Sequence, residues 1–372
     1  MRIRSMNKED SMKRARAFAA PLAATTILAG LLLTLTPVPA HASFPGKTGR
    51  IAFDDFNTGQ IYAVNPDGTA LVQLTHESDG VVALWPDWSP NGSHLLFVRL
   101  NQNGIGRIWT MRSDGSAQHQ LTSDAPGYRD FQPNYTPDGR GIVFARCQPG
   151  DGVCAIWIMR SDGTGKKALT PFKEGVREAV DFFPSVSPDG RWIAYTAFGQ
   201  NGVSSQVRVM RQNGTNNHAI SPPALQAAAP DWSPNTGRLA FNSNSQRLNS
   251  NVYTMRPDGS GIGQLTFTRY PNNNAGPVYA PGGGRVAFSS DRRYPDLCCV
   301  DLFVMNANGS NQHLVQTGLQ GILDVVWGSA PLLPTNTPSM RTTSPTGNTL
   351  APGAAMNARC KRLPKALARA VC

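Results

Sequence analysis

Six residues place aromatic rings beside carboxylates just ahead of segments that we expect to form strands. They are Trp85, Asp130, Phe131, Asp181, Phe182 and Asp324. An aromatic face packs against apolar groups or sugar rings, and a neighbouring carboxylate accepts hydrogen bonds from a bound peptide or sugar. We take these six as candidate binding residues. Core packing or solvation is the alternative role for each of them taken singly.

Motifs of catalysis are absent from the sequence. It has neither a Gly-x-Ser-x-Gly nucleophile elbow nor a His-Glu-x-x-His zinc motif. Asp54, Asp55 and Asn57 offer oxygen ligands without the full spacing of a calcium loop, and no Cys-x-x-Cys pair suggests zinc. We therefore predict no catalytic residue, no metal and no cofactor. A hydrolase or lyase that acts on polysaccharide or peptide remains the alternative.

The elements that position these residues form a repeat. The stretch Ser187–Tyr195 has variants along the chain, and its closing aromatic residue returns every 44 to 51 residues. These aromatic residues are Phe53, Phe97, Phe144, Tyr195, Phe241 and Phe288. Each copy continues to an Asp-Gly or Asn-Gly dipeptide, which is a strong hairpin signal. A period of this size is typical of a propeller.

Each copy predicts four short strands, which we call A, B, C and D. Strands B and C are nearly continuous apolar runs, as expected for sheets covered on both faces. The repeat region opens with strands B, C and D and ends with a single strand A at Asp324–Trp327. Six complete units result only if that strand joins the first three. The sequence thus predicts an all-β, six-bladed β-propeller of four-stranded blades, closed by its N-terminal and C-terminal strands.

The Ser-Pro-Asp-Gly-Arg-x-Ile-Ala-Phe run, with Ile-x-x-Met-x-x-Asp-Gly and Leu-Thr after it, resembles the propeller repeat of the TolB family. The resemblance spans roughly residues 44–330. In TolB an amino-terminal α/β domain precedes the propeller and contributes to the Tol–Pal envelope machinery. Only about eight residues separate the expected cleavage site from the first strand here, so we expect that domain to be missing.

Loop lengths distinguish two faces of the expected ring. The A–B and C–D turns keep a constant register, whereas the B–C and D–A loops vary, and Pro171–Phe183 is the longest D–A loop. Variable loops on a rigid scaffold commonly carry function. We therefore predict that the partner binds on the variable face, at the mouth of the central channel, unless the loop variation is neutral.

The two ends of the chain differ from the repeat. Residues 1–42 combine a basic start, an uncharged run and Ala40-His41-Ala42, which predicts a cleaved secretory signal. Residues 43–330 form the propeller, 331–356 a Pro/Thr-rich linker and 357–372 a basic tail that contains cysteine.

Charge follows the same division. The net charge of +11 is +4 over the signal and +6 beyond residue 330, so the propeller is nearly neutral. That excludes a basic nucleic-acid footprint. The basic tail suggests attachment to anionic lipid or wall polymer.

Cysteine usage fits an exported chain in which disulfides form. Cys147 and Cys154 flank a short loop and make the best pair, and Cys360 and Cys372 are candidates for a second bridge. The partners of the adjacent Cys298 and Cys299 are left open. We conclude that the sequence favours an extracellular, periplasmic or envelope-associated propeller that binds protein or peptide without catalysis. The alternatives are the enzyme above and a carbohydrate-binding module.

Overall fold

The structure is a computed structural model. It describes residues 45–78, 80–123, 127–149, 153–172, 180–199, 204–244, 249–294 and 299–335. The chain divides into two units, Met1–Pro39 and Ala40–Cys372, and every described residue belongs to the second. Within the described residues, no helix is long and apolar enough to cross a bilayer.

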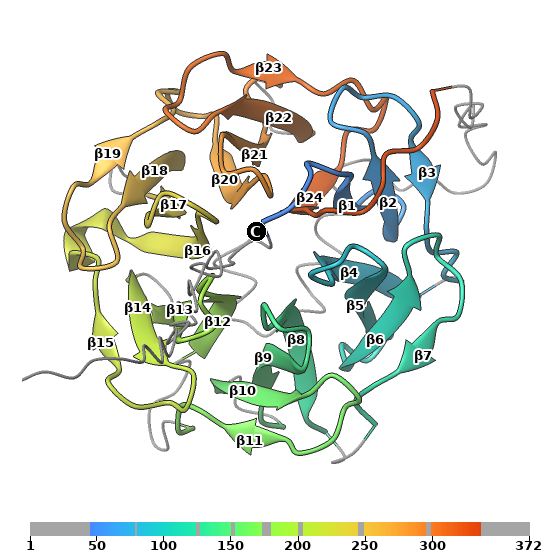
Figure 1. The fold of residues 1–372 in the computed structure, drawn as a ribbon, viewed down its shortest axis with the longest axis vertical. Helices are drawn as coiled ribbons and strands as arrows, with labels where there is room; N and C mark the ends of the chain where they lie inside the picture. Colours follow the sequence, from blue (N-terminus) through green and yellow to red (C-terminus); the bar gives the residue numbers. More distant parts are fainter. Residues whose placement is uncertain are drawn as a thin grey trace, which may run out of the picture. The chain divides into compact units, whose positions relative to one another are not determined.

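The second unit is built from antiparallel strands that fall into six sets of four (Figure 1). The strands nearest the centre, strands A, are β24 (Ile322–Trp327), β4 (Val82–Trp88), β8 (Arg129–Tyr135), β12 (Val180–Val186), β16 (Ala227–Trp232) and β20 (Asn274–Tyr279). Strands B are β1 (Ile51–Asp55), β5 (His94–Leu100), β9 (Gly141–Cys147), β13 (Trp192–Phe198), β17 (Leu239–Ser243) and β21 (Arg285–Ser290).

The outer half of each set repeats in the same way. Strands C are β2 (Gln60–Val64), β6 (Gly106–Arg112), β10 (Cys154–Arg160), β14 (Ser205–Arg211), β18 (Asn251–Met255) and β22 (Asp301–Asn306). Strands D are β3 (Val72–Gln73), β7 (His119–Gln120), β11 (Lys167–Ala168), β15 (His218–Ala219), β19 (Gly263–Gln264) and β23 (His313–Leu314). A 3-10 turn, η1 (Pro223–Leu225), precedes β16.

We number the sets along the chain. Set 1 is β24-β1-β2-β3, and sets 2 to 6 are β4–β7, β8–β11, β12–β15, β16–β19 and β20–β23. Sets 3 and 4 join into one eight-stranded sheet through a single parallel pairing of Cys154 with Val180. In set 1 the last strand pairs antiparallel with the first, with Ile51 opposite Trp327.

The repeated aromatic residues form the buried core between the sets. Phe53, Phe97, Phe144, Phe241 and Phe288 have no exposed surface, and Tyr195 is 2% exposed. Each lies in the middle of a strand B, where both faces are covered by neighbouring sheets. Burying such a ring contributes about 1.5–3 kcal/mol relative to leaving it in water.

Two repeated turns explain the motif residues. In the A–B turn, the Asp189 carboxylate accepts from the Ser187 hydroxyl at 2.6 Å and the Arg191 amide at 3.0 Å. The Asp-Gly turn between strands C and D is closed in the same way by Asp162, which accepts from the Thr164 amide at 2.8 Å. The amide of Gln212, in a C–D turn, donates to the Arg191 carbonyl at 3.0 Å. The two kinds of turn therefore lie on the same side of a set.

The Leu-Thr dipeptide after strand D also has a structural cause. The Thr170 hydroxyl accepts a hydrogen bond from the Ile156 amide at 2.9 Å, and Thr75, Thr122 and Thr266 repeat this contact in sets 1, 2 and 5. The hydroxyl satisfies a buried amide at the beginning of strand C, which would otherwise cost free energy.

Candidate binding site in the central pocket

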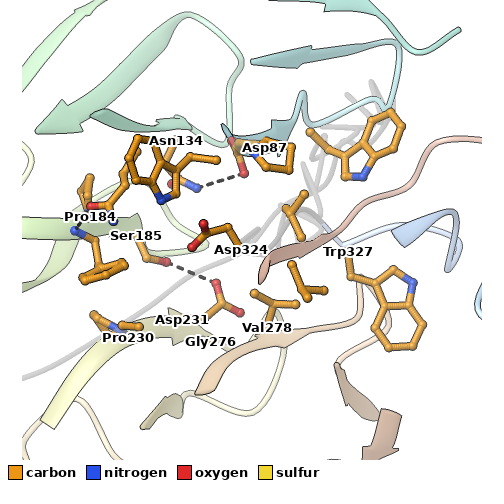
Figure 2. A pocket seen from close by; sticks show the side chains of 18 of the residues that line it. Asp87, Asn134, Pro184, Ser185, Pro230, Asp231, Gly276, Val278, Asp324 and Trp327 are labelled. Atoms are coloured by element: carbon orange, nitrogen blue, oxygen red, sulfur yellow. Dashed lines mark hydrogen bonds between the residues drawn. The ribbon is translucent and has the colours of Figure 1, made fainter. Parts of the chain in front are cut away.

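The strands A enclose a pocket of about 160 Å³ to which all six sets contribute (Figure 2). Each set supplies a short segment from the second half of its strand A, close to the A–B turn. The segments are Trp85–Trp88, Gln132–Tyr135, Phe183–Val186, Ala229–Asp231, Gly276–Tyr279 and Asp324–Trp327. Residues separated by more than two hundred positions in sequence therefore share one cavity.

A β-bulge lies at the first residue of every segment. These residues have positive φ angles: Trp85 52°, Gln132 48°, Phe183 53°, Ala229 50°, Gly276 57° and Asp324 41°. The pairing of strand A with strand B shifts register at the same place in each set. A bulge bends a strand and re-aims its side chains, and residues outside the common backbone regions cluster at functional sites.

Hydrogen bonds join neighbouring sets along the larger part of the pocket wall, where sets 2 to 5 place polar residues at equivalent positions. The Asp87 carboxylate accepts from the Tyr135 amide at 2.8 Å and from the Asn134 side-chain amide at 3.2 Å. The Asp231 carboxylate likewise accepts from the Tyr279 amide at 2.8 Å. The Ser185 hydroxyl, from set 4, also donates to Asp231 at 3.4 Å (Figure 2). These contacts fix the spacing of the strands that line the pocket.

The buried carboxylate of Asp87 holds its proton more tightly than an ordinary aspartate. Removal from water raises its pKa well above the usual value, and the charge of Asp231 adds to the effect. The amide hydrogen bonds from Tyr135 and Asn134 act in the opposite direction, and the loss of hydration outweighs them. The Asp87 carboxyl group therefore gives up its proton less readily than an exposed aspartate does.

The equivalent positions of sets 6 and 1 are apolar. Val278 and Val326 occupy in sets 6 and 1 the positions that Asp87 and Asp231 occupy in sets 2 and 5. Asp324 stands at the bulge of set 1, is half-buried, and has its carboxylate among the lining residues (Figure 2). The pocket therefore presents one polar wall, one apolar wall and a carboxylate.

Comparisons with known proteins agree with this architecture. Residues 176–325 match the TolB beta propeller domain family. The crystal structure of TolB from Acinetobacter baumannii aligns with a TM-score of 0.62 at 18% identity, over 77% of this chain and 68% of that one. A TolB candidate from Agrobacterium tumefaciens aligns with a TM-score of 0.57 at 19% identity, over 76% and 93%.

The chain contains a TolB-like β-propeller. The same fold occurs in a chain of a nidogen/laminin complex, with a TM-score of 0.57 at 13% identity, over 76% of this chain and 99% of that one. Identities this low establish the fold of the TolB-like propeller and nothing about its ligand.

The TolB-like propeller brings only two of the six sequence-predicted residues to its pocket. Trp85 and Asp324 line it. Asp130, Phe131, Asp181 and Phe182 have no exposed surface and lie outside the pocket lining. They precede the bulge by one or two residues, so they face the packing between sets. We therefore do not retain these four as contact residues.

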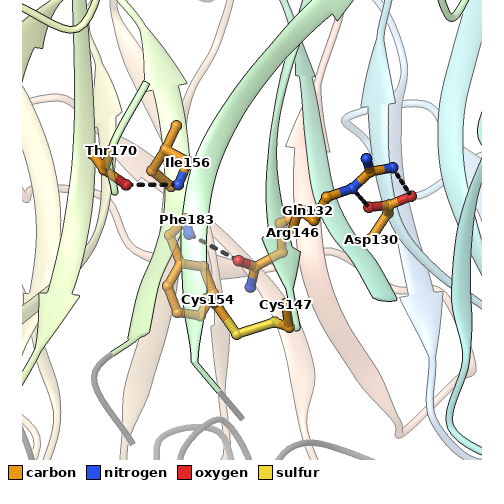
Figure 3. Close-up of a disulfide and its surroundings, with 8 residues drawn as sticks. All are labelled: Asp130, Gln132, Arg146, Cys147, Cys154, Ile156, Thr170 and Phe183. Atoms are coloured by element: carbon orange, nitrogen blue, oxygen red, sulfur yellow. Dashed lines mark hydrogen bonds and ion pairs between the residues drawn. A yellow bond between two sulfur atoms is a disulfide. The ribbon is translucent and has the colours of Figure 1, made fainter. Parts of the chain in front are cut away.

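Two of these buried residues have clear structural roles. The Arg146 guanidinium binds both oxygens of Asp130, at 2.7 Å and 3.0 Å, and the side chains are 4% and 0% exposed (Figure 3). Phe131 packs edge-on against Trp85, with ring centres 5.4 Å apart. The ion pair lies directly before the bulge of set 3, and the ring contact packs against Trp85 at the bulge of set 2.

Aligning the repeat on proline would have found the residues that sequence reasoning missed. Gln132, Phe183, Ala229 and Gly276 each precede a proline, as Trp85 does. Proline has no N–H to donate to a strand ladder and within sheets is confined to edges, strand starts and bulges, so the dipeptide marks the bulge. Set 1 has Asp324-Val325 at this point, which hides the sixth position from that search.

The pocket lies on the side of the A–B turns, because its lining residues directly precede those turns. We predicted a site on the opposite face, among the variable B–C and D–A loops. Several of those loops lie partly outside the described residues, including 150–152, 173–179 and 200–203. A partner on that face stays a prediction.

The predicted bridge between Cys147 and Cys154 is present (Figure 3). It links the ends of β9 and β10 that carry the B–C loop of set 3. Cys360 and Cys372 lie outside the described residues. Within the described part of the chain, no group of three or more His, Cys, Asp or Glu side chains could hold a metal ion.

Proposed function

We propose that this TolB-like propeller is an exported, non-catalytic platform that binds a protein or peptide segment at its central pocket. The observation that carries the proposal is the pocket itself, which is lined by residues of all six sets. It combines a polar wall, an apolar wall and the half-buried Asp324. Binding sites typically combine apolar surface with a few fixed polar groups.

We also propose that the six sets are six blades of a closed ring. The pairing of β24 with β1 supports closure. Neighbouring sets share one packing contact, in which the glycine of each C–D turn lies against the end of strand D in the preceding set. Gly68 of set 1 makes this contact with Gln316 of set 6, as Gly115 of set 2 does with Leu74 of set 1. This likeness between the contact of Gly68 and that of Gly115 supports the proposed closure.

The chemistry of the pocket favours a peptide with a donor group on one side. Asp324 offers oxygen acceptors to a backbone amide or a cationic side chain, and Val278 and Val326, from the neighbouring and the same set respectively, pack against apolar atoms beside it. A pocket of about 160 Å³ accommodates one side chain or a short turn rather than a long ligand. The partner would then insert a small part of its chain and spread over the surrounding turns.

A propeller hydrolase or lyase is the second candidate, because Asp87 has a raised pKa beside the pocket. Both oxygens of Asp87 already accept hydrogen bonds from the protein, which favours a structural role. For location, we propose export through residues 1–42, and contact of the basic residues beyond 356 with anionic lipid or wall polymer of the cell envelope.

A comparative pull-down tests the platform. Mature chain 43–372 is immobilised and exposed to envelope extract in three forms: wild type, Asp324→Lys, and Asp162→Lys as a matched charge change on an exposed turn outside both cavities. We expect a protein that the wild type and Asp162→Lys retain and that Asp324→Lys loses. Equal retention by all three forms contradicts the pocket as the site, and retention of glycan alone contradicts a protein platform. Turnover of polysaccharide or peptide that Asp87→Asn abolishes would establish the enzyme instead.

A further inference from the structure

A second and larger cavity lies between sets 4 and 5, on the side of the A–B and C–D turns. It is a groove of about 500 Å³. The aromatic, proline and aliphatic residues that line it are Pro188, Trp192, Val209, His218, Trp232 and Pro257. We propose that this groove binds the proline-containing segment of the same chain, residues 336–352.

The groove arises from a change of residue type at one repeated position, which directly precedes the buried part of strand B. In set 1 that residue is Arg50, whose guanidinium lies 5.3 Å from the centre of the Trp88 ring of the next set. In set 6 it is Arg285, whose guanidinium lies 5.0 Å from the Trp327 ring. Set 4 has Trp192 in place of the arginine.

Trp192 lies against its own set. Its ring stands edge-on to His218, with centres 6.4 Å apart, and the Arg211 guanidinium lies 5.1 Å from the Trp192 ring centre. The indole therefore forms one wall of the groove, and Trp232 of set 5 forms part of the other. An aromatic groove of this kind suits an extended, proline-rich chain, whose ordering costs little entropy.

The A–B turns of other neighbouring sets lie in contact. A Cβ placed on Gly139 would lie 3.7 Å from Pro90 of the preceding set. The Asn235 side-chain amide donates to the Gly282 carbonyl at 2.9 Å. At the boundary of sets 4 and 5, a Cβ placed on Gly237 would meet no described atom within 4 Å. The turns of sets 4 and 5 thus leave the groove open to a ligand from that side.

The chain already uses its own C-terminal extension to fill a boundary between sets. After β24 it crosses from set 1 to set 2, where Ala330 is fully buried and the Ser329 hydroxyl donates to the Pro90 carbonyl at 2.9 Å. Farther along, the Leu333 amide donates to the Asn65 side chain at 3.0 Å, and that side chain donates back to the Leu333 carbonyl at 2.9 Å. Both contacts involve turns on the side that carries the groove.

The next part of the chain has the composition and the length to reach the groove. Residues 336–352 contain Pro338, Pro345 and Pro352, one arginine and no acidic residue. At about 3.1 Å per residue, an extended segment of this length spans roughly 50 Å. The groove lies three sets away, or roughly 30 Å at about 10 Å between packed sheets.

Charge favours the same occupant. The groove is flanked by Asp189 and Asp258. Hydrogen bonds from Ser260 lower the pKa of Asp258, so that carboxylate stays ionised at neutral pH. Arg341 is the charged residue of the segment, and the chain beyond residue 330 carries only positive side chains. Opposite charges near an apolar groove orient the ligand and speed its docking.

Peptide competition tests the proposal in the mature, full-length chain. The probe is a fluorescent peptide of residues 336–352, and its anisotropy is measured with wild type and with a tail variant in which Pro338, Pro345 and Pro352 are serine. We expect the tail variant to bind the peptide roughly tenfold or more tightly than wild type, because the tethered segment competes at high effective concentration. Equal affinities, or no binding to the tail variant, overturn the proposal.

Two further changes in the tail variant locate the site. Trp192→Arg introduces the residue that set 1 and set 6 already carry, so the fold should tolerate it, and we expect peptide binding to fall by roughly tenfold or more. His94→Arg makes the same change at the equivalent position of set 2 and should leave binding unaltered. Should Trp192→Arg fail to fold, Trp192→Leu removes the ring and must weaken binding too. Unchanged binding overturns the site, and wild-type dimers that dissociate on Trp192→Arg would assign the groove to a second copy's segment instead.

Discussion

Loss of the Cys147–Cys154 bridge should destabilise the propeller by an amount that its loop length sets. The bridge closes a loop at a sequence separation of 7. Restricting the unfolded chain over so short a loop removes about 8 cal/mol/K of entropy, or about 2.5 kcal/mol at 25 °C. For a chain of this size, that corresponds to a fall in melting temperature of about 5 °C.

The measurement is urea unfolding of oxidised residues 43–372, compared with Cys147→Ala/Cys154→Ala in the same segment. Both sulfur-bearing residues are buried, so alanine avoids placing a hydroxyl in the core. The control is Cys360→Ala/Cys372→Ala, which leaves this loop closed. An unfolding free energy equal to that of the control would refute the loop-entropy reasoning. A loss above about 5 kcal/mol would show that the bridge holds native packing instead.

Three further predictions concern single groups. Asp87→Asn should remove a pH dependence of the unfolding free energy. Burial raises the Asp87 pKa, so the wild type is relatively most stable below about pH 4 and loses that advantage as pH rises towards the pKa of Asp87 in the folded chain. Urea midpoints of wild type and variant that stay parallel from roughly pH 3.5 to 8 would contradict this. Arg146→Met leaves the Asp130 carboxylate buried without its guanidinium partner and should lower the free energy of unfolding in urea by about 3–5 kcal/mol. The double variant Arg146→Met/Asp130→Leu should recover much of that loss. A double variant no more stable than the single one would argue against the ion pair as the cause. Ala117→Gly should stabilise the chain by about 1 kcal/mol, because Ala117 is exposed and has a φ of 53° that glycine adopts freely; a lowered midpoint would disprove this account.

The sequence predicted the strands and turns because their causes are local. Asp-Gly and Asn-Gly dipeptides favour hairpin turns wherever they occur. The aromatic column at Phe97, Phe144 and its equivalents marked the middle of each buried strand B. The pair Cys147 and Cys154 was also predictable, since two cysteines that flank a short loop between paired strands are close in almost any packing.

The candidate site was only partly predictable, because a bulge shifts the alternation of side chains by one residue. Trp85 and Asp324 stand at the bulge and line the pocket, whereas Asp130 and Phe131 precede it and are buried. A regular alternation of side chains that ignores the bulge does not distinguish these four residues from one another. The proline after Trp85 was the local sign of the difference.

The sequence by itself determined the repeat, its four strands and its turns, since these follow from propensities within a few residues. The tertiary structure alone decided which side chains meet. The pocket collects six segments that are distant in the chain, and the raised pKa of Asp87 comes from burial among strands of neighbouring sets. The groove beside Trp192 likewise depends on how set 5 packs against set 4. Burial and charge coupling are properties of surroundings, which folding assembles from remote residues.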